Sequence, residues 1–150
     1  MLKAGDPAPD IRLRTDAGEE FRLSALKGKR VVLYFYPRAN TPGCTTEACE
    51  FRDGIRAFAK KGAAVVGVSP DKPAAQAKFK AQFDLPFTLL ADEERAAAQA
   101  YGVWKEKNLY GKKVMGIERS TFIVGPDGKI ERIYARVKAK GHAAEVLAEL

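Results

Sequence analysis

The sequence predicts an α/β fold in which strands and helices alternate along one domain. Two continuous apolar runs, Val31 to Tyr36 and Ala63 to Ser69, are typical of strands that are covered on both faces. Each run is followed by a segment with helical periodicity, which favours crossover connections between neighbouring strands. With 150 residues, of which 46% are hydrophobic, the chain has the size and composition of a single globular domain covering residues 1 to 150.

The N-terminal segment predicts a small β-hairpin. Ile11 to Arg14 and Glu20 to Leu23 alternate apolar and polar residues on either side of Asp16-Ala17-Gly18, a turn sequence. Ser24 to Gly28 then reads as a helical turn that a glycine closes. The strand Val31 to Tyr36 follows directly.

The middle of the chain predicts three helices and two further strands. The expected elements are a helix from Thr41 that Gly62 ends, the strand Ala63 to Ser69, a helix from Pro73 to Phe83, a short strand from Phe87 to Ala91, and a helix from Glu93 to Tyr101. Asp92 stands at the N-cap of the last helix and Gly102 ends it.

The last third predicts a second hairpin and a terminal helix. Lys105 to Gly116 is a polar, lysine-rich stretch, which we interpret as a connection. Arg119 to Val124 and Ile130 to Val137 are strands joined by a Gly-Pro-Asp-Gly turn. Gly141 to Leu150 has the apolar spacing of an amphipathic helix.

One cysteine stands at a helix start. Pro37 ends the first buried strand, Thr41 is the expected N-cap, and Pro42 suits the first helical position. Cys44 therefore lies in the first turn, where the Thr41 hydroxyl is expected to accept hydrogen bonds from nearby N–H groups. A helix N-terminus stabilises negative charge, so this position suits a reactive thiolate. The expected inward stripe of the helix consists of Cys44, Ala48, Phe51, Ile55 and Phe58.

The second cysteine, Cys49, lies five residues further along the same helix. Five residues turn a helix by about 500°, so this side chain falls about 140° away from Cys44, beside Arg52 and Asp53. Helix geometry separates the two Cα atoms by about 8.7 Å, whereas a disulfide needs roughly 7 Å or less. A bond between the two would require the helix to open. Gly54 lowers the local helix propensity by about 1 kcal/mol relative to alanine.

The residues alone leave other roles open for the cysteines. A free cysteine is often only a small buried hydrophobe, and Cys49 by itself fits that interpretation equally well. A disulfide between the two cysteines that only stabilises the fold is disfavoured. It would close a loop of about six residues, which adds only about 2 kcal/mol to the free energy of unfolding, and it would break the helix. Zinc is disfavoured as well, because four ligands are needed and the single histidine, His142, is far along the chain.

The stretch from Pro37 to Cys44 resembles the peroxiredoxin signature of Pro, three residues, Thr, two residues and Cys. The continuation to Asp53 is similar to the bacterioferritin-comigratory, or Q-type, branch, in which a second cysteine follows five residues after the first. The resemblance covers nearly the whole chain without a large insertion. Other matching segments are Gly67 to Asp71, Leu85 to Phe87, Tyr101 to Trp104 and Arg119 to Phe122.

The resemblance implies a thioredoxin-like fold with an N-terminal β-hairpin extension and a central mixed sheet flanked by helices. It also implies a thioredoxin-dependent thiol peroxidase that reduces hydrogen peroxide and organic hydroperoxides to water and alcohols. Cys44 would be the peroxidatic residue and form a sulfenic acid. Cys49 would resolve it as an intramolecular disulfide, which thioredoxin or a similar dithiol donor reduces.

The family pattern also implies helpers for the thiolate. The Thr41 hydroxyl, the N–H groups of the helix start and Arg119 would stabilise charge on the breaking O–O bond, and Pro37 would shield the thiolate from water. Nothing in spacing marks Arg119, so its assignment rests on the resemblance. Glu47 receives no chemical role, and Trp104 and Tyr110 are interpreted as packing residues. We expect no cofactor, no metal and a monomer.

Charge and composition leave two competing functions to test. The net charge is +7, which raises nucleic acid as a partner. The charge is spread along the chain, however, and a solvated surface is favoured, with Lys105 to Lys113 as a patch that would steer an acidic protein. A thioredoxin-like disulfide oxidoreductase is the alternative enzyme, although four residues separate the cysteines instead of the usual two. Without an apolar span or signal segment, we expect a cytoplasmic protein that binds neither membrane nor nucleic acid.

Overall fold

The computed structural model describes residues 1–150, which form a seven-stranded mixed sheet, its covering helices and a separate two-stranded hairpin. The strands are β1 (Arg12–Thr15), β2 (Glu20–Arg22), β3 (Arg30–Phe35), β4 (Ala63–Ser69), β5 (Thr88–Ala91), β6 (Trp104–Leu109), β7 (Lys112–Ile117), β8 (Ser120–Val124) and β9 (Ile130–Tyr134). The helices are the 3-10 turn η1 (Leu23–Leu26) and α1 (Pro42–Asp53), α2 (Ile55–Lys60), α3 (Pro73–Phe83), α4 (Ala96–Ala100) and α5 (His142–Ala148).

The sheet has the order β2-β1-β5-β4-β3-β8-β9. Its centre is the parallel trio β3, β4 and β5, and the two hairpins add antiparallel strands at either side. β3 is therefore paired on both edges, with Leu33 opposite Val66 on β4 and Phe122 on β8. The expected N-terminal hairpin extension is thus part of the main sheet, where β1 pairs with β5.

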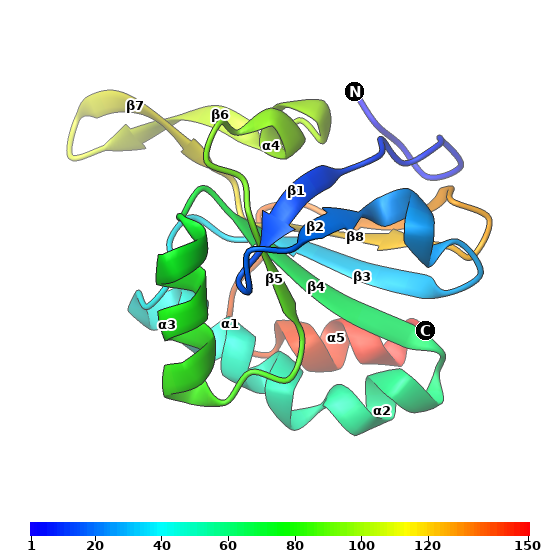
Figure 1. Cartoon of the computed structure of the whole chain (residues 1–150). Coiled ribbons are helices and arrows are strands. Elements are labelled where there is room, and N and C mark those ends of the chain that lie inside the picture. Colours follow the sequence, from blue (N-terminus) through cyan, green and yellow to red (C-terminus); the bar gives the residue numbers. More distant parts are fainter.

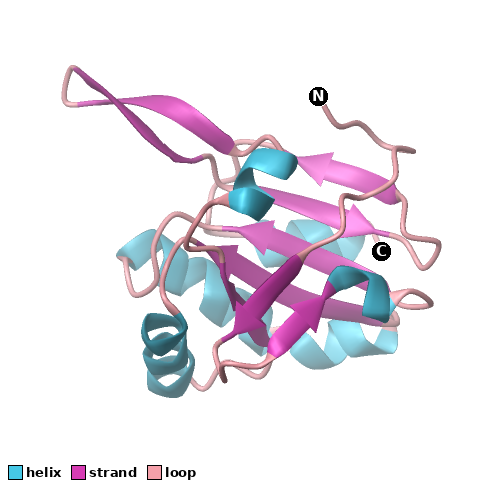
Figure 2. Ribbon diagram, turned by 45° about the horizontal axis from the view of Figure 1, so that its top comes forward, coloured by secondary structure: helices cyan, strands magenta, loops and turns pink.

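Two helical layers sandwich the sheet and create two cores (Figure 1 and Figure 2). α1, α2, α3 and α5 cover one face, and η1 and α4 lie against the other. β3 supplies both cores by alternation: Val31, Leu33 and Phe35 enter one core, and Val32 and Tyr34 enter the other together with Tyr36, the residue after the strand. The apolar run of β3 is explained by this burial on both faces.

Several elements agree with the sequence expectation, whereas two helices differ from it in their bounds. β4 and α3 have the predicted bounds. The helix that contains both cysteines was expected to continue to Gly62, but it ends at Asp53 and α2 begins after Gly54. α4 is also shorter than expected, because it begins only after Arg95, which has a positive φ of 58°. Asp92 nevertheless caps it as predicted, since its carboxylate accepts from the Ala97 N–H at 3.1 Å and the Ala98 N–H at 2.8 Å.

The expectation of an irregular connection over Lys105 to Gly116 is wrong. These residues form the β6–β7 hairpin, which extends away from the sheet (Figure 1 and Figure 2). Tyr110 and Gly111 make its two-residue turn, both with positive φ. The expected packing role of Tyr110 is wrong too, because this side chain is 96% exposed. Trp104, by contrast, packs partly buried against the core.

None of the helices is both long enough and apolar enough to span a bilayer.

Candidate active site

The site begins where β3 ends and α1 starts. After Phe35 the chain leaves the sheet through the half-buried Pro37, and Thr41 takes the extended N-cap conformation with φ of −89° and ψ of 157°. Pro42 occupies the first helical position, as expected. Cys44 is therefore held in the first turn, at the carboxyl end of the central strand.

Thr41 does not cap the helix with its side chain, so that part of the expectation is wrong. Its hydroxyl donates instead to the carbonyl of Arg38 at 2.9 Å. The N–H groups of Gly43 and Cys44 consequently have no protein acceptor, since the first backbone bond of the helix runs from Thr45 N–H to the Thr41 carbonyl at 2.8 Å. Two N–H donors of the first turn are therefore unpaired, which is the arrangement that lets a helix start bind negative charge.

Arg119 connects the thiol to a buried carboxylate. Its Nη2 donates to Cys44 Sγ at 3.3 Å and its Nη1 to Glu47 Oε1 at 2.6 Å. Cys44 is 1% exposed and the Glu47 side chain is fully buried, while Arg119 keeps 16% of its side chain exposed. The planar guanidinium fork can make both bonds at once, which a lysine ammonium does less well. From the sequence, only the family resemblance points to Arg119, and nothing marks Glu47.

Burial and charge act against each other on this pair. Burial raises the pKa of Glu47 to about 7, although the positive charge of Arg119 opposes the shift. Burial lowers the pKa of Arg119, but the charges of Glu47 and Cys44 outweigh it, so its net pKa is raised and the guanidinium stays charged. Gly43 gives it room, since a Cβ there would lie 3.2 Å from Arg119 Nη2.

A second set of polar residues anchors the loop before α1. Asp71, which follows β4, accepts hydrogen bonds from the Ala39 N–H at 2.7 Å and from the Ser69 hydroxyl at 2.6 Å. Gln76 in α3 donates to Ser69 at 2.9 Å and accepts from the Tyr36 hydroxyl. Sequence reasoning missed this network. The signal for it was present, because Ser-Pro-Asp follows directly on the neighbouring parallel strand, whose carboxyl end shares an edge with β3.

Cys49 lies in the same unbroken helix, and both thiols are free. Its side chain is half-buried and no hydrogen-bond partner is recorded for it, whereas Cys44 is buried and bonded to Arg119. As long as α1 is intact, the two cysteines are held apart.

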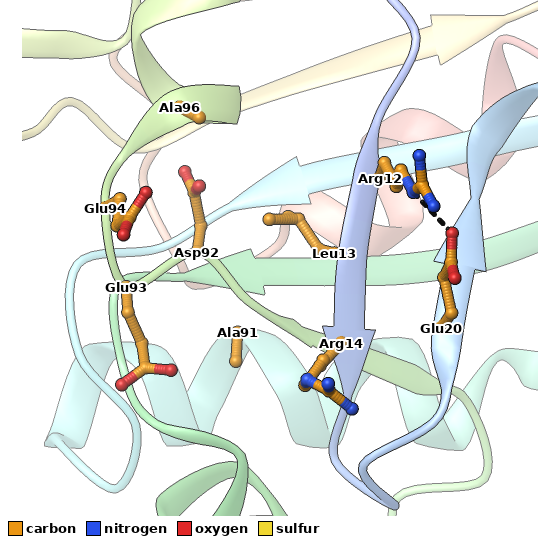
Figure 3. A pocket seen from close by; sticks show the side chains of 9 residues that line it. All are labelled: Arg12, Leu13, Arg14, Glu20, Ala91, Asp92, Glu93, Glu94 and Ala96. Atoms are coloured by element: carbon orange, nitrogen blue, oxygen red, sulfur yellow. Dashed lines mark hydrogen bonds and ion pairs between the residues drawn. The ribbon is translucent and has the colours of Figure 1, made fainter.

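Other candidate features lie elsewhere. No group of three or more His, Cys, Asp or Glu side chains is arranged to hold a metal. His142 is buried at the start of α5, where its ring contacts Thr121 Oγ1 at 2.7 Å and Glu145 Oε1 at 3.0 Å. A hollow of about 770 Å³ lies between β1 and the loop before α4 (Figure 3). Two of the charged residues that line it, Arg12 and Glu20, form an ion pair with each other. Neither Cys44 nor Arg119 lines this hollow.

Comparison with known proteins gives consistent matches. Residues 4–133 match the model of the AhpC/TSA family. The chain is 50% identical over 149 residues to peroxiredoxin Bcp of Bacillus subtilis, covering 99% of this chain and 95% of the relative.

Solved structures of similar proteins share the fold. The bacterioferritin comigratory protein of Xanthomonas campestris, described for its alkyl peroxide reduction activity, superposes with a TM-score of 0.92 at 40% identity, over 98% of this chain and 96% of that one. A PrxQ mutant of Xylella fastidiosa superposes with a TM-score of 0.94 at 37% identity, over 99% and 95%. These matches confirm the expected thioredoxin-like architecture with a mixed central sheet and flanking helices.

Proposed function

The chain belongs to the AhpC/TSA family, and from this premise we propose that Cys44 and Cys49 carry out its thiol peroxidase reaction in two successive steps. The observation that carries the proposal is the bond from Arg119 Nη2 to Cys44 Sγ, 3.3 Å long, at the first turn of α1. It joins a nucleophile, a fixed positive charge and two unpaired N–H donors at one point.

In the first step the Cys44 thiolate attacks the distal oxygen of hydrogen peroxide or an organic hydroperoxide. The S–O bond forms as the O–O bond breaks, and the departing oxygen leaves as water or an alcohol after taking up a proton. Arg119 and the N–H groups of Gly43 and Cys44 lie where they can stabilise negative charge on both oxygens. The product at sulfur is a sulfenic acid.

Thiolate formation accounts for only part of such a rate. An ordinary thiol with pKa about 8.5 is roughly 3% ionised at neutral pH, so complete ionisation gains about thirtyfold at most. The larger share has to come from donors that are already oriented toward the charge of the transition state. Glu47, by fixing the guanidinium of Arg119, supports that orientation. Pro37, half-buried in the loop before α1, is proposed to limit the access of water, and Thr41 to place an oxygen near the peroxide.

In the second step Cys49 condenses with the sulfenic acid. Its sulfur bonds to the Cys44 sulfur, and the hydroxyl leaves as water. Both cysteines are in one helix and are separated by about 8.7 Å at their Cα atoms, which is more than the roughly 7 Å that a disulfide permits. Resolution therefore requires the first turns of α1 to open. The break at Gly54 limits the opening to a helix of 12 residues.

Recycling is proposed to use thioredoxin. A reduced dithiol attacks the Cys44–Cys49 disulfide, and exchange returns two thiols to this chain while the donor is oxidised to its own disulfide. This requirement for a reduced dithiol pool favours the cytoplasm as its location. Since both cysteines belong to one chain, residues 1 to 150 acting as a single-domain monomer are sufficient for the cycle.

The test is a thiol count and an intact mass after one equivalent of hydrogen peroxide, with and without thioredoxin and its reductase. The proposal predicts loss of both thiols and of two hydrogens, with full recovery when thioredoxin is added. Retention of both thiols would refute the cysteine cycle. Loss of both thiols without recovery by thioredoxin, but with recovery by dithiothreitol, would keep the cycle and refute the proposed reductant.

A further inference from the structure

The β6–β7 hairpin exposes apolar side chains that nothing in the chain covers. Four of the five exposed large hydrophobic side chains belong to it, namely Leu109, Tyr110, Val114 and Met115, and the other is Met1. The hairpin forms its own two-stranded sheet and projects from the body of the protein (Figure 2). Apolar side chains gathered on one exposed element mark an interaction surface more often than an accident of packing.

The turn of the hairpin places an aromatic residue where the backbone disfavours it. Tyr110 has a φ of 50° and Gly111 a φ of 77°, between the paired residues Leu109 and Lys112. Such a turn favours asparagine at the first position, because a bulky residue with positive φ is strained. The Tyr110 ring is 96% exposed, so little packing offsets the strain. Strain of this kind tends to be retained where a residue has a function.

The hairpin is also positively charged. The hairpin contains four lysines, at 105, 107, 112 and 113, and only one acidic residue, Glu106. Glu106 forms a long ion pair with Lys113, at 3.7 Å. Lys105 is neutralised by Glu118 at 2.7 Å. The lysines at 107, 112 and 113 are therefore the cations available to a partner. The surface combines apolar anchors with positive charge, which fits a partner whose own apolar patch is bordered by acidic groups.

The position of the hairpin relates this surface to the thiol. β7 ends at Ile117, and only Glu118 separates it from Arg119, whose guanidinium contacts Cys44. Lys107 is half-buried on one face of the hairpin, with its stem beside Gly116 of the facing strand. Burial is the main cause that lowers the pKa of Lys107. The positive charge of Arg119 lowers it further, whereas the charge of Cys44 opposes the shift. Val114 is its cross-strand partner and so shares that face.

Distances favour a protein that reaches the site and the hairpin together. The six paired residues of each strand span about 20 Å. A specific protein interface of about 800 Å² per partner has a diameter of roughly 32 Å, so a single interface centred between the thiols and the hairpin turn can cover both. A small peroxide has no such reach.

We propose that the β6–β7 hairpin is the docking arm for the dithiol protein that reduces the Cys44–Cys49 disulfide. The inference rests on the proposed recycling step and adds where the reductant binds. Tyr110, Leu109 and Val114 supply apolar contacts, and the free lysines attract a reductant with an acidic surface. A second copy of this chain is disfavoured as the occupant, because two surfaces of the same positive charge would meet.

The test compares reduction of the oxidised protein by thioredoxin with its reduction by dithiothreitol. Tyr110→Asn is the main variant, because asparagine followed by glycine suits this turn and the hairpin is expected to remain folded. Lys112→Glu with Lys113→Glu reverses the charge of the arm. Lys60→Glu with Lys61→Glu, at exposed positions where α2 ends, is the matched control with the same change in net charge.

We expect the second-order rate constant for thioredoxin to fall at least about tenfold in each hairpin variant. Reduction by dithiothreitol and oxidation by peroxide should be unchanged, and the control should match wild type. The wild-type rate constant should also fall as salt rises, more steeply than that of the Lys112/Lys113 variant.

Other outcomes separate the possible failures. If thioredoxin reduces wild type and the hairpin variants equally well, the docking arm is refuted and the recycling step stands. If thioredoxin does not reduce wild type while dithiothreitol does, the recycling step fails and this inference with it. Concentration-dependent self-association, or binding to vesicles of anionic lipid, that is lost in Tyr110→Asn while the thioredoxin rate is unchanged would assign the arm to a different occupant and overturn the proposal.

Discussion

The two faces of α1 hold chemically identical side chains in different surroundings. Cys44 on the inner face is buried and accepts a hydrogen bond from Arg119 at 3.3 Å. Cys49 on the outer face is half-buried and has no such partner. In the proposed cycle this difference separates two tasks: the inner face stabilises a thiolate and the breaking peroxide bond, and the outer face holds the second thiol until the helix opens.

The same comparison explains why the inner face is rigid. Its arginine is fixed by a buried carboxylate, Glu47, and the loop that leads into α1 is tied to Asp71. Oriented donors stabilise a transition state without having to reorganise. Cys49 itself has no such bond, and the outer face is tied down by its neighbours, because Glu50 accepts from the Gly141 N–H at 2.8 Å and Arg52 donates to the Phe83 carbonyl at 2.8 Å. Local opening of the helix has to break these bonds. The proposed cycle therefore asks two things of α1: fixed donors around Cys44 in the first step, and local opening that brings Cys49 to Cys44 in the second.

The largest expected effect comes from removing the inner thiol. Cys44→Ser should abolish peroxide reduction completely, because a serine hydroxyl has no accessible anionic form near neutral pH and is a far weaker nucleophile toward peroxide. Peroxide consumption measured with thioredoxin and its reductase checks this. Normal turnover in this variant would contradict the division of tasks between the faces.

Removing the outer thiol should separate the two steps. In Cys49→Ser the first oxidation should proceed at a rate within about threefold of wild type, since this residue lies away from Arg119. Turnover with thioredoxin should stop after one cycle, with the oxidised protein trapped as sulfenic acid. A sulfenic-acid-specific reagent followed by mass spectrometry measures the trapped species. Sustained thioredoxin-dependent turnover would show that Cys49 is not needed for resolution.

The charge on the inner face is tested by a conservative change. Arg119→Lys keeps the charge but cannot hold Cys44 and Glu47 with one planar fork, so the rate of oxidation by peroxide should fall by about 10² or more. Stopped-flow measurement of the first step provides the number. Arg136→Lys is the control, because Arg136 is 86% exposed and contacts only Glu118, at 3.7 Å. Equal rates for both variants would remove Arg119 from the first step.

The smallest expected effect concerns stability and pH. Burial raises the pKa of Glu47 to about 7 in the folded protein, whereas the unfolded value is near 4.5. Between these values the folded state holds a proton that the unfolded state has released, so stability falls as pH rises through this window. Glu47→Gln should remove this slope, a change on the order of 2 kcal/mol between pH 4.5 and 7. Urea unfolding at several pH values measures it, and identical slopes in both proteins would contradict the raised pKa.

How much the sequence revealed differs between the same regions. β4 and α3 were predicted with their bounds because each has one clear period and strong boundary residues. The hairpin was missed because neither of its faces is buried along its length, so its apolar residues show no alternation. The pairing of Arg119 with Glu47 was not readable either, because the two lie 72 positions apart and only the fold brings them together.

Local geometry accounts for the remaining differences. The residue types correctly placed Thr41 at the N-cap, but they do not determine its rotamer, and its hydroxyl donates to the Arg38 carbonyl instead. The only sequence feature that indicates the helix break at Gly54 is the low helix propensity of glycine. Side-chain orientation and long-range pairing are therefore the parts of this site that required the structure.

Amide hydrogen exchange of α1, measured in the reduced and the peroxide-oxidised protein, tests the central claim most directly. Exchange should be slow over the residues from Thr45 to Asp53 in the reduced protein, because the first backbone bond of α1 is made by the Thr45 N–H. Exchange should be fast over the same residues once the disulfide has formed, with little change in β3 and β4. An oxidised protein that contains the disulfide but keeps α1 protected would contradict the claim that one helix must open to carry out both steps.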